Sequence, residues 1–359
     1  MKPFLLLAYN INNNTMATLE TQYKNWIFDN PSSTFTIEEW KKDYFGKLFK
    51  NVKELIMKNK NYVIFHIEGG IGKNIMATAV AKAIKKKYPE RELIIVTAWE
   101  DVWFNHTDVS RVYKFGALSY FYEDMVKDND SIIMMHDPYH STEHIYGREH
   151  LIKTWCELFG LEFNNEEPEL FLTPREIDFV RNQILGNIQK PIFIIQPNGG
   201  MQDLPYSWSR DIPFGIAQDI VNHYAKDFHI FQIKRENQPL LNNANALTLP
   251  LRQLFTVLLF SNKRLFIDSF GQHAAAALGL PSTVTWIINK PNVFGYDMHE
   301  NIVSDVKETF NTTKYSYLSP YNITGAVNEY PYDTRNILDI NKILDALTIE
   351  KESFIKYDF

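Results

Sequence analysis

The stretch that decides the fold runs from Asn61 to Ala98 and reads NYVIFHIEGGIGKNIMATAVAKAIKKKYPERELIIVTA. It opens with NYVIFHI, a short β-branched and aromatic run that stops at the residues Glu68-Gly69-Gly70. A helical pattern follows and ends before Pro89, and ELIIVTA is a second strand-like run. A strand, a glycine turn, a helix and a strand in this order are typical of a βαβ unit in a parallel sheet.

The second half of the chain repeats this order. Strands are predicted at 191–197, 228–233, 264–269 and 282–288, and helices at 214–224, 251–261 and 273–279. We therefore predict an α/β protein of two Rossmann-like domains, 1–172 and 173–359, with a C-terminal helix at about 336–348 that can return to the first domain. Ligands of such sheets bind outside the carboxyl ends of the strands.

Composition restricts the function. The 359 residues carry 37 Lys+Arg and 43 Asp+Glu, a formal net charge of −6, which gives no global attraction to nucleic acid. The lone cysteine excludes an intrachain disulfide and a cysteine-cluster metal site, and it fits a reducing compartment. The N-terminus shows no signal-peptide pattern, and no apolar run reaches the roughly 18 residues of a membrane span. We expect a cytoplasmic protein without a transmembrane segment.

The segment DSFGQHAAAALGLP, from Asp268 to Pro281, carries the strongest local signal. A strand delivers Asp268 and Ser269 to a turn at Gly271, and a helix starts near Gln272. The free amides and positive end of that helix predict a phosphate or diphosphate site. The competing interpretation is that Asp268 or Ser269 only caps the helix and that the alanines only allow close packing.

The loop EGGIGKN, 68–74, resembles two nucleotide-binding motifs without matching either. A Walker A motif needs Gly where Ile67 stands and Ser or Thr where Asn74 stands, and the dinucleotide motif needs Gly at Ile75. After these two motifs are excluded, the loop still provides a flexible backbone that begins a helix beside Lys73. Such a loop suits binding of an anion or a sugar. The alternative interpretation is that the glycines only form a tight turn.

The run His140-Ser141-Thr142-Glu143-His144 matches H-x-x-E-H, a zinc-peptidase pattern. Three fixed identities in a histidine-rich stretch are a weak signal, and two α/β halves are the wrong setting for such a peptidase. We expect these residues to line the cleft or the surface, and we predict no metal site.

Between Tyr62 and Asn301 the chain resembles glycosyltransferase family 9, the heptosyltransferase-like enzymes of bacterial surface-glycan (lipopolysaccharide) assembly, which have the GT-B fold. The motifs that carry the resemblance are GGIGKNIMATAVAKAIKKKYP, HLIKTWCELFGLE, IIQPNGG with YSWSR, and DSFGQHAAAALGLPSTVTW. The chain departs from the family at three places. Lys73 stands where the family has its proposed base, an aspartate. Tyr206 replaces a lysine, and Phe270 replaces a glycine.

The resemblance implies transfer of a sugar from a nucleotide-sugar donor, ADP- or UDP-linked, to a glycan or glycolipid acceptor, with inversion and without a metal or other cofactor. It implies that the donor is held by a set of residues in the second domain: Asn198, Gly199, Gly200, Trp208, Arg210, Glu236, Asp268, Ser269, Gly271, Gln272 and His273. The acceptor is expected near Gly69, Gly70, Gly72 and Asn74.

The sequence leaves open which residue is the base that takes the acceptor proton. The candidates lie after predicted strands of the first domain, and we place the catalytic role on Lys73, Asp137 and His140, with Glu68 and Asp101 as alternatives. Two other functions are also open: glycosylation of a modified nucleic-acid base, against which the acidic balance argues, and sugar-nucleotide binding without catalysis. Peripheral contact with a membrane stays an alternative as well.

Overall fold

The computed structural model describes residues 16–57, 61–199, 207, 209–304 and 332–349, with side chains of the first segment described from 21 to 47. The chain forms two compact units. The smaller comprises residues 1–60 and 120–130, and the larger comprises 61–119 and 131–359.

The smaller unit is built around a helical hairpin of α2 (Met16–Asp29) and α3 (Ile37–Met57), with a short π-helix, η1 (Tyr122–Val126). Aromatic rings join the two helices, because the buried Trp40 of α3 packs against Tyr23 of α2 with ring centroids 5.7 Å apart. Trp40 also stacks on Tyr44 of its own helix, at 5.0 Å. Thr36 starts α3 with a capping box, in which its Oγ1 accepts from the amide of Glu39 while its own amide donates to the Glu39 carboxylate.

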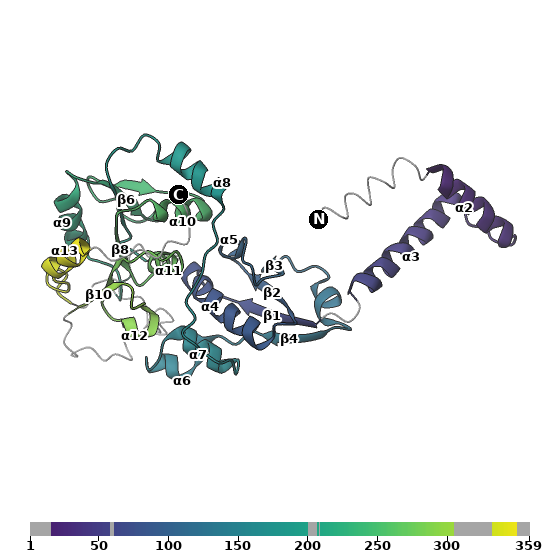
Figure 1. The fold of residues 1–359 in the computed structure, drawn as a ribbon, viewed down its shortest axis with the longest axis horizontal. Coiled ribbons are helices and arrows are strands. Elements are labelled where there is room, and N and C mark those ends of the chain that lie inside the picture. Colours follow the sequence, from purple (N-terminus) through teal and green to yellow (C-terminus); the bar gives the residue numbers. More distant parts are fainter. Residues whose placement is uncertain (1–15, 58–60, 200–206, 208, 305–331, 350–359) are drawn as a thin grey trace. The chain divides into compact units, whose positions relative to one another are not determined.

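The larger unit begins with a four-stranded sheet in the order β3-β2-β1-β4. Its strands are β1 (Asn61–Ile67), β2 (Glu92–Thr97), β3 (Arg111–Lys114) and β4 (Asp130–Met134). β1 and β2 are parallel, as the βαβ pattern predicts, and the expected bounds of β1 are confirmed. The helices are α4 (Ile71–Lys87), α5 (Glu100–Trp103), the 3₁₀ turn η2 (Pro138–His140), α6 (Thr142–Ile145) and α7 (Leu151–Leu158) (Figure 1).

The second sheet has the order β10-β9-β8-β5-β6-β7, and its neighbouring strands are parallel. The strands are β5 (Ile192–Ile195), β6 (His229–Ile233), β7 (Asn245–Leu247), β8 (Lys263–Ile267), β9 (Thr283–Trp286) and β10 (Glu300–Val303). The helices are α8 (Pro174–Phe179), η3 (Val180–Ile184), α9 (Phe214–Tyr224), α10 (Leu251–Leu259), α11 (Phe270–Ala277), α12 (Pro291–Phe294) and α13 (Ile340–Thr348). Two α/β halves in one unit confirm the predicted fold class.

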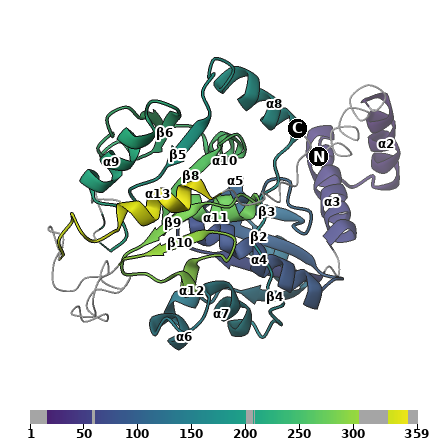
Figure 2. The same ribbon diagram turned by 60° about the vertical axis from the view of Figure 1, so that its left-hand side comes forward.

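The C-terminal helix corrects one expectation. α13 packs against α9, β8, β9 and β10 of the second half and does not return to the first (Figure 2). Its Ile343 and Leu347 are buried in the apolar cluster on the face of the second sheet that α9 also covers. The spacing of these two residues places them on one side of the helix, so α13 is held where that apolar stripe is buried.

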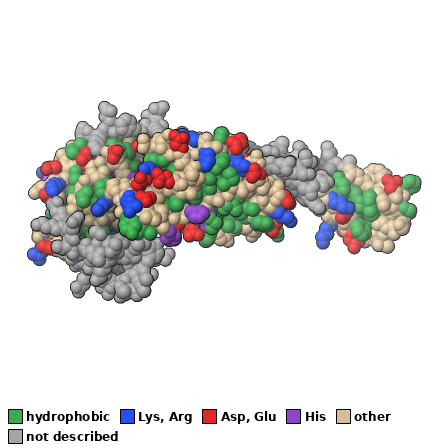
Figure 3. Space-filling view, turned by 90° about the horizontal axis from the view of Figure 1, so that it is seen from below, with side chains coloured by type: hydrophobic (Ala, Val, Ile, Leu, Met, Phe, Trp, Pro, Cys, Tyr) green, Lys and Arg blue, Asp and Glu red, His purple; other side chains and the backbone are tan. Residues whose placement is uncertain are grey.

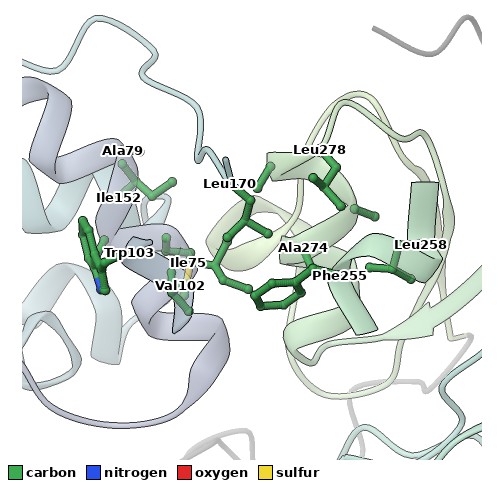
Figure 4. Close-up of a cluster of buried hydrophobic side chains, with 14 of the residues drawn as sticks. Ile75, Ala79, Val102, Trp103, Ile152, Leu170, Phe255, Leu258, Ala274 and Leu278 are labelled. Carbon is green, nitrogen blue, oxygen red and sulfur yellow. The ribbon is translucent and has the colours of Figure 1, made fainter. Parts of the chain in front are cut away.

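The two halves of the larger unit share one apolar core. Ile75 and Ala79 of α4 and Trp103 of α5 belong to the same buried cluster as Phe255 of α10 and Ala274 of α11 (Figure 4). α4 and α11 approach so closely that a methyl group added at Gly72 would lie 2.8 Å from His273 Cδ2. A small residue is therefore needed at that position.

An arginine clamp adds polar contacts between the halves. Arg252 of α10 donates to both carboxylate oxygens of Glu176, from Nε at 2.7 Å and from Nη2 at 2.8 Å. Its Nη1 reaches the Asp101 carbonyl in the first half at 3.1 Å, and Nη2 reaches the Phe171 carbonyl at 2.6 Å. The side chain is only 10% exposed, so water competes little for these bonds.

We expect Gly72→Ala to destabilise the larger unit by about 1–3 kcal/mol, because the new methyl group overpacks a buried contact between α4 and α11. The matched control is Gly70→Ala, which meets no atom within 4 Å and should cost less than about 1 kcal/mol. Urea unfolding measures both. Equal effects of the two substitutions would show that α4 and α11 do not meet as described.

Arg252→Ala should destabilise the chain by about 3 kcal/mol, since it removes the cation paired with Glu176 and leaves two carbonyls without this donor in a largely buried site. Arg181→Ala serves as the control because Arg181 is 41% exposed and lies 3.5 Å from Asp178, a surface pair worth less than about 1 kcal/mol. The midpoint of thermal unfolding reports the difference, and a small effect of Arg252→Ala would rule out the clamp.

Candidate functional site

A cavity of about 450 Å³ lies where the carboxyl ends of the two sheets face each other. The first half contributes the start of α4 and two residues that follow strands, and the second half contributes loops after β5, β6, β8 and β9. Its lining residues are Gly70, Ile71, Gly72, Lys73, Met76, Trp99, Tyr139, Ser207, Ser209, Arg210, Arg235, Asp268, Ser269, Phe270, His273, Asn289 and Phe294. Its place agrees with the general rule for ligand sites in such sheets.

The start of α11 forms one wall. The helix begins at Phe270, two residues earlier than expected, with Ser269 as its N-cap residue in an extended conformation. Gln196 binds this end twice: its Nε2 donates to Ser269 Oγ at 3.1 Å, and its Oε1 accepts from the Gly271 amide at 3.1 Å. A methyl group at Gly271 would lie 2.5 Å from Gln196 Oε1. Gly271 therefore serves this contact with Gln196, and Ser269 lines the cavity.

Arg210 brings a positive charge to the cavity. Its Nη1 donates to the Asp268 carbonyl at 3.1 Å, and its guanidinium covers Gly199 so closely that a methyl group there would lie 2.5 Å from Nε. Neighbouring Asp211 holds the loop by accepting from the Gly199 amide at 2.7 Å and from Asn198 Nδ2 at 3.2 Å. Asn198 and Gly199 thus shape the loop that carries Arg210. Burial raises the pKa of Asp211 to about 6, although these bonds oppose the rise.

Arg235 and Asn289 also line the cavity, and neither was predicted from the sequence. Glu236, expected among the donor-binding residues, is exposed and does not line the cavity, whereas its neighbour Arg235 does. Asn289 Nδ2 donates to the buried carboxylate of Asp268, whose pKa is raised by burial. Arg235 follows β6 and Asn289 follows β9, and these positions just after strands could have identified both as candidates for the site.

His273 is buried and neutral. Its Nδ1 lies 2.9 Å from the hydroxyl of Tyr296, and burial lowers its pKa to about 3, with His150 and His299 acting in the same direction. Gln272 is buried beside it and donates from Nε2 to the Phe294 carbonyl at 2.9 Å. His273 can therefore offer the cavity a neutral ring at pH 7, and the positive charge of this wall comes from the arginines.

Lys73 and Asp137 form an ion pair at the opposite wall. Lys73 Nζ lies 2.7 Å from Asp137 Oδ2, and the lysine side chain is only 3% exposed. The ammonium also lies over the rings of Tyr139 and Trp155, at 4.8 and 5.3 Å from their centroids. Burial lowers the pKa of Lys73, and the carboxylates of Asp137 and Glu68 oppose that effect in part. Lys73 lines the cavity, and Asp137 contacts Lys73 from outside the set of lining residues.

The glycine loop divides into residues that line the cavity and residues that support it. Gly70 and Gly72 line the cavity, whereas Gly69 adopts a φ of 96° and accepts from Trp99 Nε1 at 2.9 Å. Asn74 is fully buried, accepts from Thr97 Oγ1 and donates to the Gly70 carbonyl at 3.2 Å. Asn74 thus supports the loop from inside the first domain.

The H-x-x-E-H run does not form one helix. His140 ends η2 and is exposed, Ser141 is extended, and His144 is buried in α6 with its ring 4.9 Å from that of Tyr139. The zinc-peptidase hypothesis is therefore wrong. In the part of the chain that the structure describes, no group of three or more His, Cys, Asp or Glu side chains is placed to hold a metal ion.

Glu68 is exposed, and Asp101 uses its backbone carbonyl in the Arg252 clamp. Gly200 and Trp208, both expected at the donor site, lie outside the described residues. Within the described ranges, no helix is long and apolar enough to cross a membrane.

Protein-family models and curated proteins give no match to this sequence. Several solved structures, in contrast, are similar to this chain. The chain is similar to a glycosyl transferase family 9 protein from Veillonella parvula DSM 2008, with a TM-score of 0.56 and 10% identity over 81% of this chain and 97% of that one. It is also similar to the ADP-heptose lipopolysaccharide heptosyltransferase II of E. coli, with a TM-score of 0.54 and 13% identity over 80% and 97% of the two chains.

A third structure of similar fold is an iron-containing dodecameric glycosyltransferase from enterotoxigenic E. coli H10407. Its TM-score is 0.50, with 12% identity over 68% of this chain and 62% of that one. At these identities the likenesses show the fold. The chain has the GT-B arrangement of two Rossmann-like domains, and the resemblance to glycosyltransferase family 9 is confirmed at that level.

Proposed function

We propose that the chain is a glycosyltransferase that moves a sugar from a nucleotide-sugar donor to a hydroxyl of a glycan or glycolipid acceptor. The observation that carries the proposal is the two-sided cavity: two arginines and the start of α11 lie on one wall, and the buried Lys73, paired with the partly exposed Asp137, lies on the other. One side suits a diphosphate, and the other suits the proton transfer that sugar transfer needs.

The donor lies against the second half. Arg210, Arg235 and the Ser269 hydroxyl face the cavity, and cationic and hydroxyl donors stabilise the charge that gathers on a departing diphosphate. The start of α11 adds the positive end of the helix dipole, while the Gly271 amide itself donates to Gln196. Because these groups supply the stabilisation themselves, we propose transfer without a metal. An ADP-linked sugar is the first donor to test, since one of the structures of similar fold is named for ADP-heptose.

The Lys73–Asp137 pair acts as the base. Lys73 Nζ first passes a proton to Asp137 Oδ2, and the neutral amine that results takes the hydroxyl proton as the acceptor oxygen attacks the anomeric carbon, so that the carboxylate holds the net proton. The bond from the anomeric carbon to the diphosphate oxygen breaks, and the nucleoside diphosphate leaves. Attack opposite the leaving group inverts the configuration. The lowered pKa of Lys73 favours this role.

The acceptor lies against the first half, near Gly70, Gly72 and the indole of Trp99. We also propose that the boundary between the two domains falls near residue 172. The alternative of a nucleic-acid acceptor gains no support from the face of the described residues drawn in Figure 3, where acidic and basic side chains are interspersed. His140 is exposed and stands outside the cavity lining, so we assign it no part in the reaction.

Nucleotide binding tests the donor wall. ADP or UDP should raise the unfolding temperature of the wild-type protein, as mass action requires for a ligand of the folded state. Arg210→Ala and Arg235→Ala should each weaken that binding by about tenfold, the loss of one charge-assisted contact. Glu236→Ala is the control and should leave it unchanged. A nucleotide response that survives both arginine substitutions would place the donor elsewhere.

Transfer assays test the base. Lys73→Met and Asp137→Asn should each lower kcat by about 10²–10⁴-fold while nucleotide binding persists, because they remove proton transfer and leave the donor wall intact. His140→Gln should keep wild-type kcat, and EDTA should leave transfer unaffected. Full activity of Asp137→Asn would refute the assigned base. The wild-type protein could also bind a nucleotide but neither transfer nor hydrolyse any sugar donor. That result would favour a binding protein without catalysis.

A further inference from the structure

One buried glutamine, Gln238, joins the two loops that carry the arginines of the donor wall. It is 5% exposed and lies three residues after Arg235, in the loop after β6. Its side-chain Oε1 accepts from the Arg235 amide at 2.8 Å, and its Nε2 donates to the Gly199 carbonyl at 2.6 Å in the loop after β5. Because one partner is an N–H and the other is a carbonyl, they fix which end of the side-chain amide faces which loop.

Gln238 holds Arg235 on both sides of its backbone. The main-chain amide of Gln238 donates to the Arg235 carbonyl at 3.2 Å and closes a turn, while the Arg235 amide donates to Gln238 Oε1. Arg235 is exposed and lines the cavity, so these bonds, rather than burial, hold its backbone beside the site.

The other end of the Gln238 side chain reaches the loop under Arg210. Gly199 is also bound on both sides of its backbone, because its amide donates to Asp211 at 2.7 Å and its carbonyl accepts from Gln238. The Arg210 guanidinium covers this glycine so closely that an added methyl group would lie 2.5 Å from Nε. A shift of Gly199 would therefore displace Arg210, and Gln238 connects the two cations through a continuous chain of contacts.

We propose that Gln238 is a positioning residue of the donor site, which sets the spacing of Arg210 and Arg235 so that both contact the same diphosphate. The inference rests on the proposed function and adds the residue that makes the two loops act together. Gln238 stands outside the set of described lining residues, so it acts through the arginines. Charge-assisted hydrogen bonds depend on geometry, and donors that are already held in place bind with a smaller cost of ordering the loops.

Nucleotide binding by the full chain tests this role, with ADP and UDP as the probes. Gln238→Ala should weaken binding of the nucleotide that stabilises the wild-type protein by about tenfold, because each loop loses a bond that holds a cation in place.

Gln232→Ala is the matched control. Gln232 is a fully buried residue of β6, and its side-chain amide also makes two bonds to the backbone: Nε2 donates to the Pro239 carbonyl at 2.9 Å, and Oε1 accepts from the Leu241 amide at 2.8 Å. These bonds stay within the loop after β6 and do not reach Gly199. Gln232→Ala should therefore destabilise the fold and leave nucleotide binding close to that of the wild type.

A second variant separates positioning from loss of stability. A protonated glutamate resembles glutamine in shape, with one donor and one acceptor, whereas a carboxylate would lie against the Gly199 carbonyl. Gln238→Glu should bind nucleotide as poorly as Gln238→Ala at about pH 8, and it should bind more tightly than Gln238→Ala as the pH falls and the buried carboxyl is protonated. Comparison of the two variants at each pH removes the effect of other titrating groups, such as Asp211 and the nucleotide itself.

Three results would overturn the positioning role while the donor site stands: wild-type binding by Gln238→Ala, an equal loss in Gln232→Ala, or binding by Gln238→Glu that follows Gln238→Ala at every pH. If neither nucleotide binds the wild-type protein, the donor site itself is refuted, and the role of Gln238 falls with it.

Discussion

The close approach of α4 and α11 is the constraint on which the rest of the larger unit depends. Both helices follow the carboxyl end of a strand, and their first turns meet where Gly72 faces His273. That contact joins the two apolar cores into one cluster and brings the loops of both sheets around a single cavity. Small residues in both helices permit it, because a core at crystal-like density leaves no room for an added methyl group.

The electrostatics of the cavity follow from burial. Histidine and tyrosine side chains behind α11 are buried so deeply that they stay neutral, so they support the wall without charging it. Among the described lining residues, positive charge comes from Arg210, Arg235 and Lys73, and Lys73 is balanced by Asp137. A chain of net charge −6 can therefore present a cationic site, because low-dielectric walls make a few local charges count for more than the sum over the surface.

Much of the fold and part of the cavity could be predicted from local patterns. The bounds of β1 and α9 agree with the apolar runs, and Ser269, Arg210 and Lys73 line the cavity as their places after strands suggest. Other residues predicted for the site do not line the cavity. Glu236 and His140 are exposed, and Asn74 is buried inside its own domain. Adjacent residues of a loop point in different directions, and only three-dimensional packing decides which of them faces a ligand.

By itself the sequence determined the two α/β halves, the glycine turns and the loops that end at the carboxyl edges of the sheets, because those features depend on local periodicity and turn chemistry. The tertiary structure alone decided the pairing of Lys73 with Asp137, the Arg252 clamp and the return of α13 to the second sheet. These contacts join residues far apart in the sequence, and their energies depend on distances and burial that no local pattern encodes.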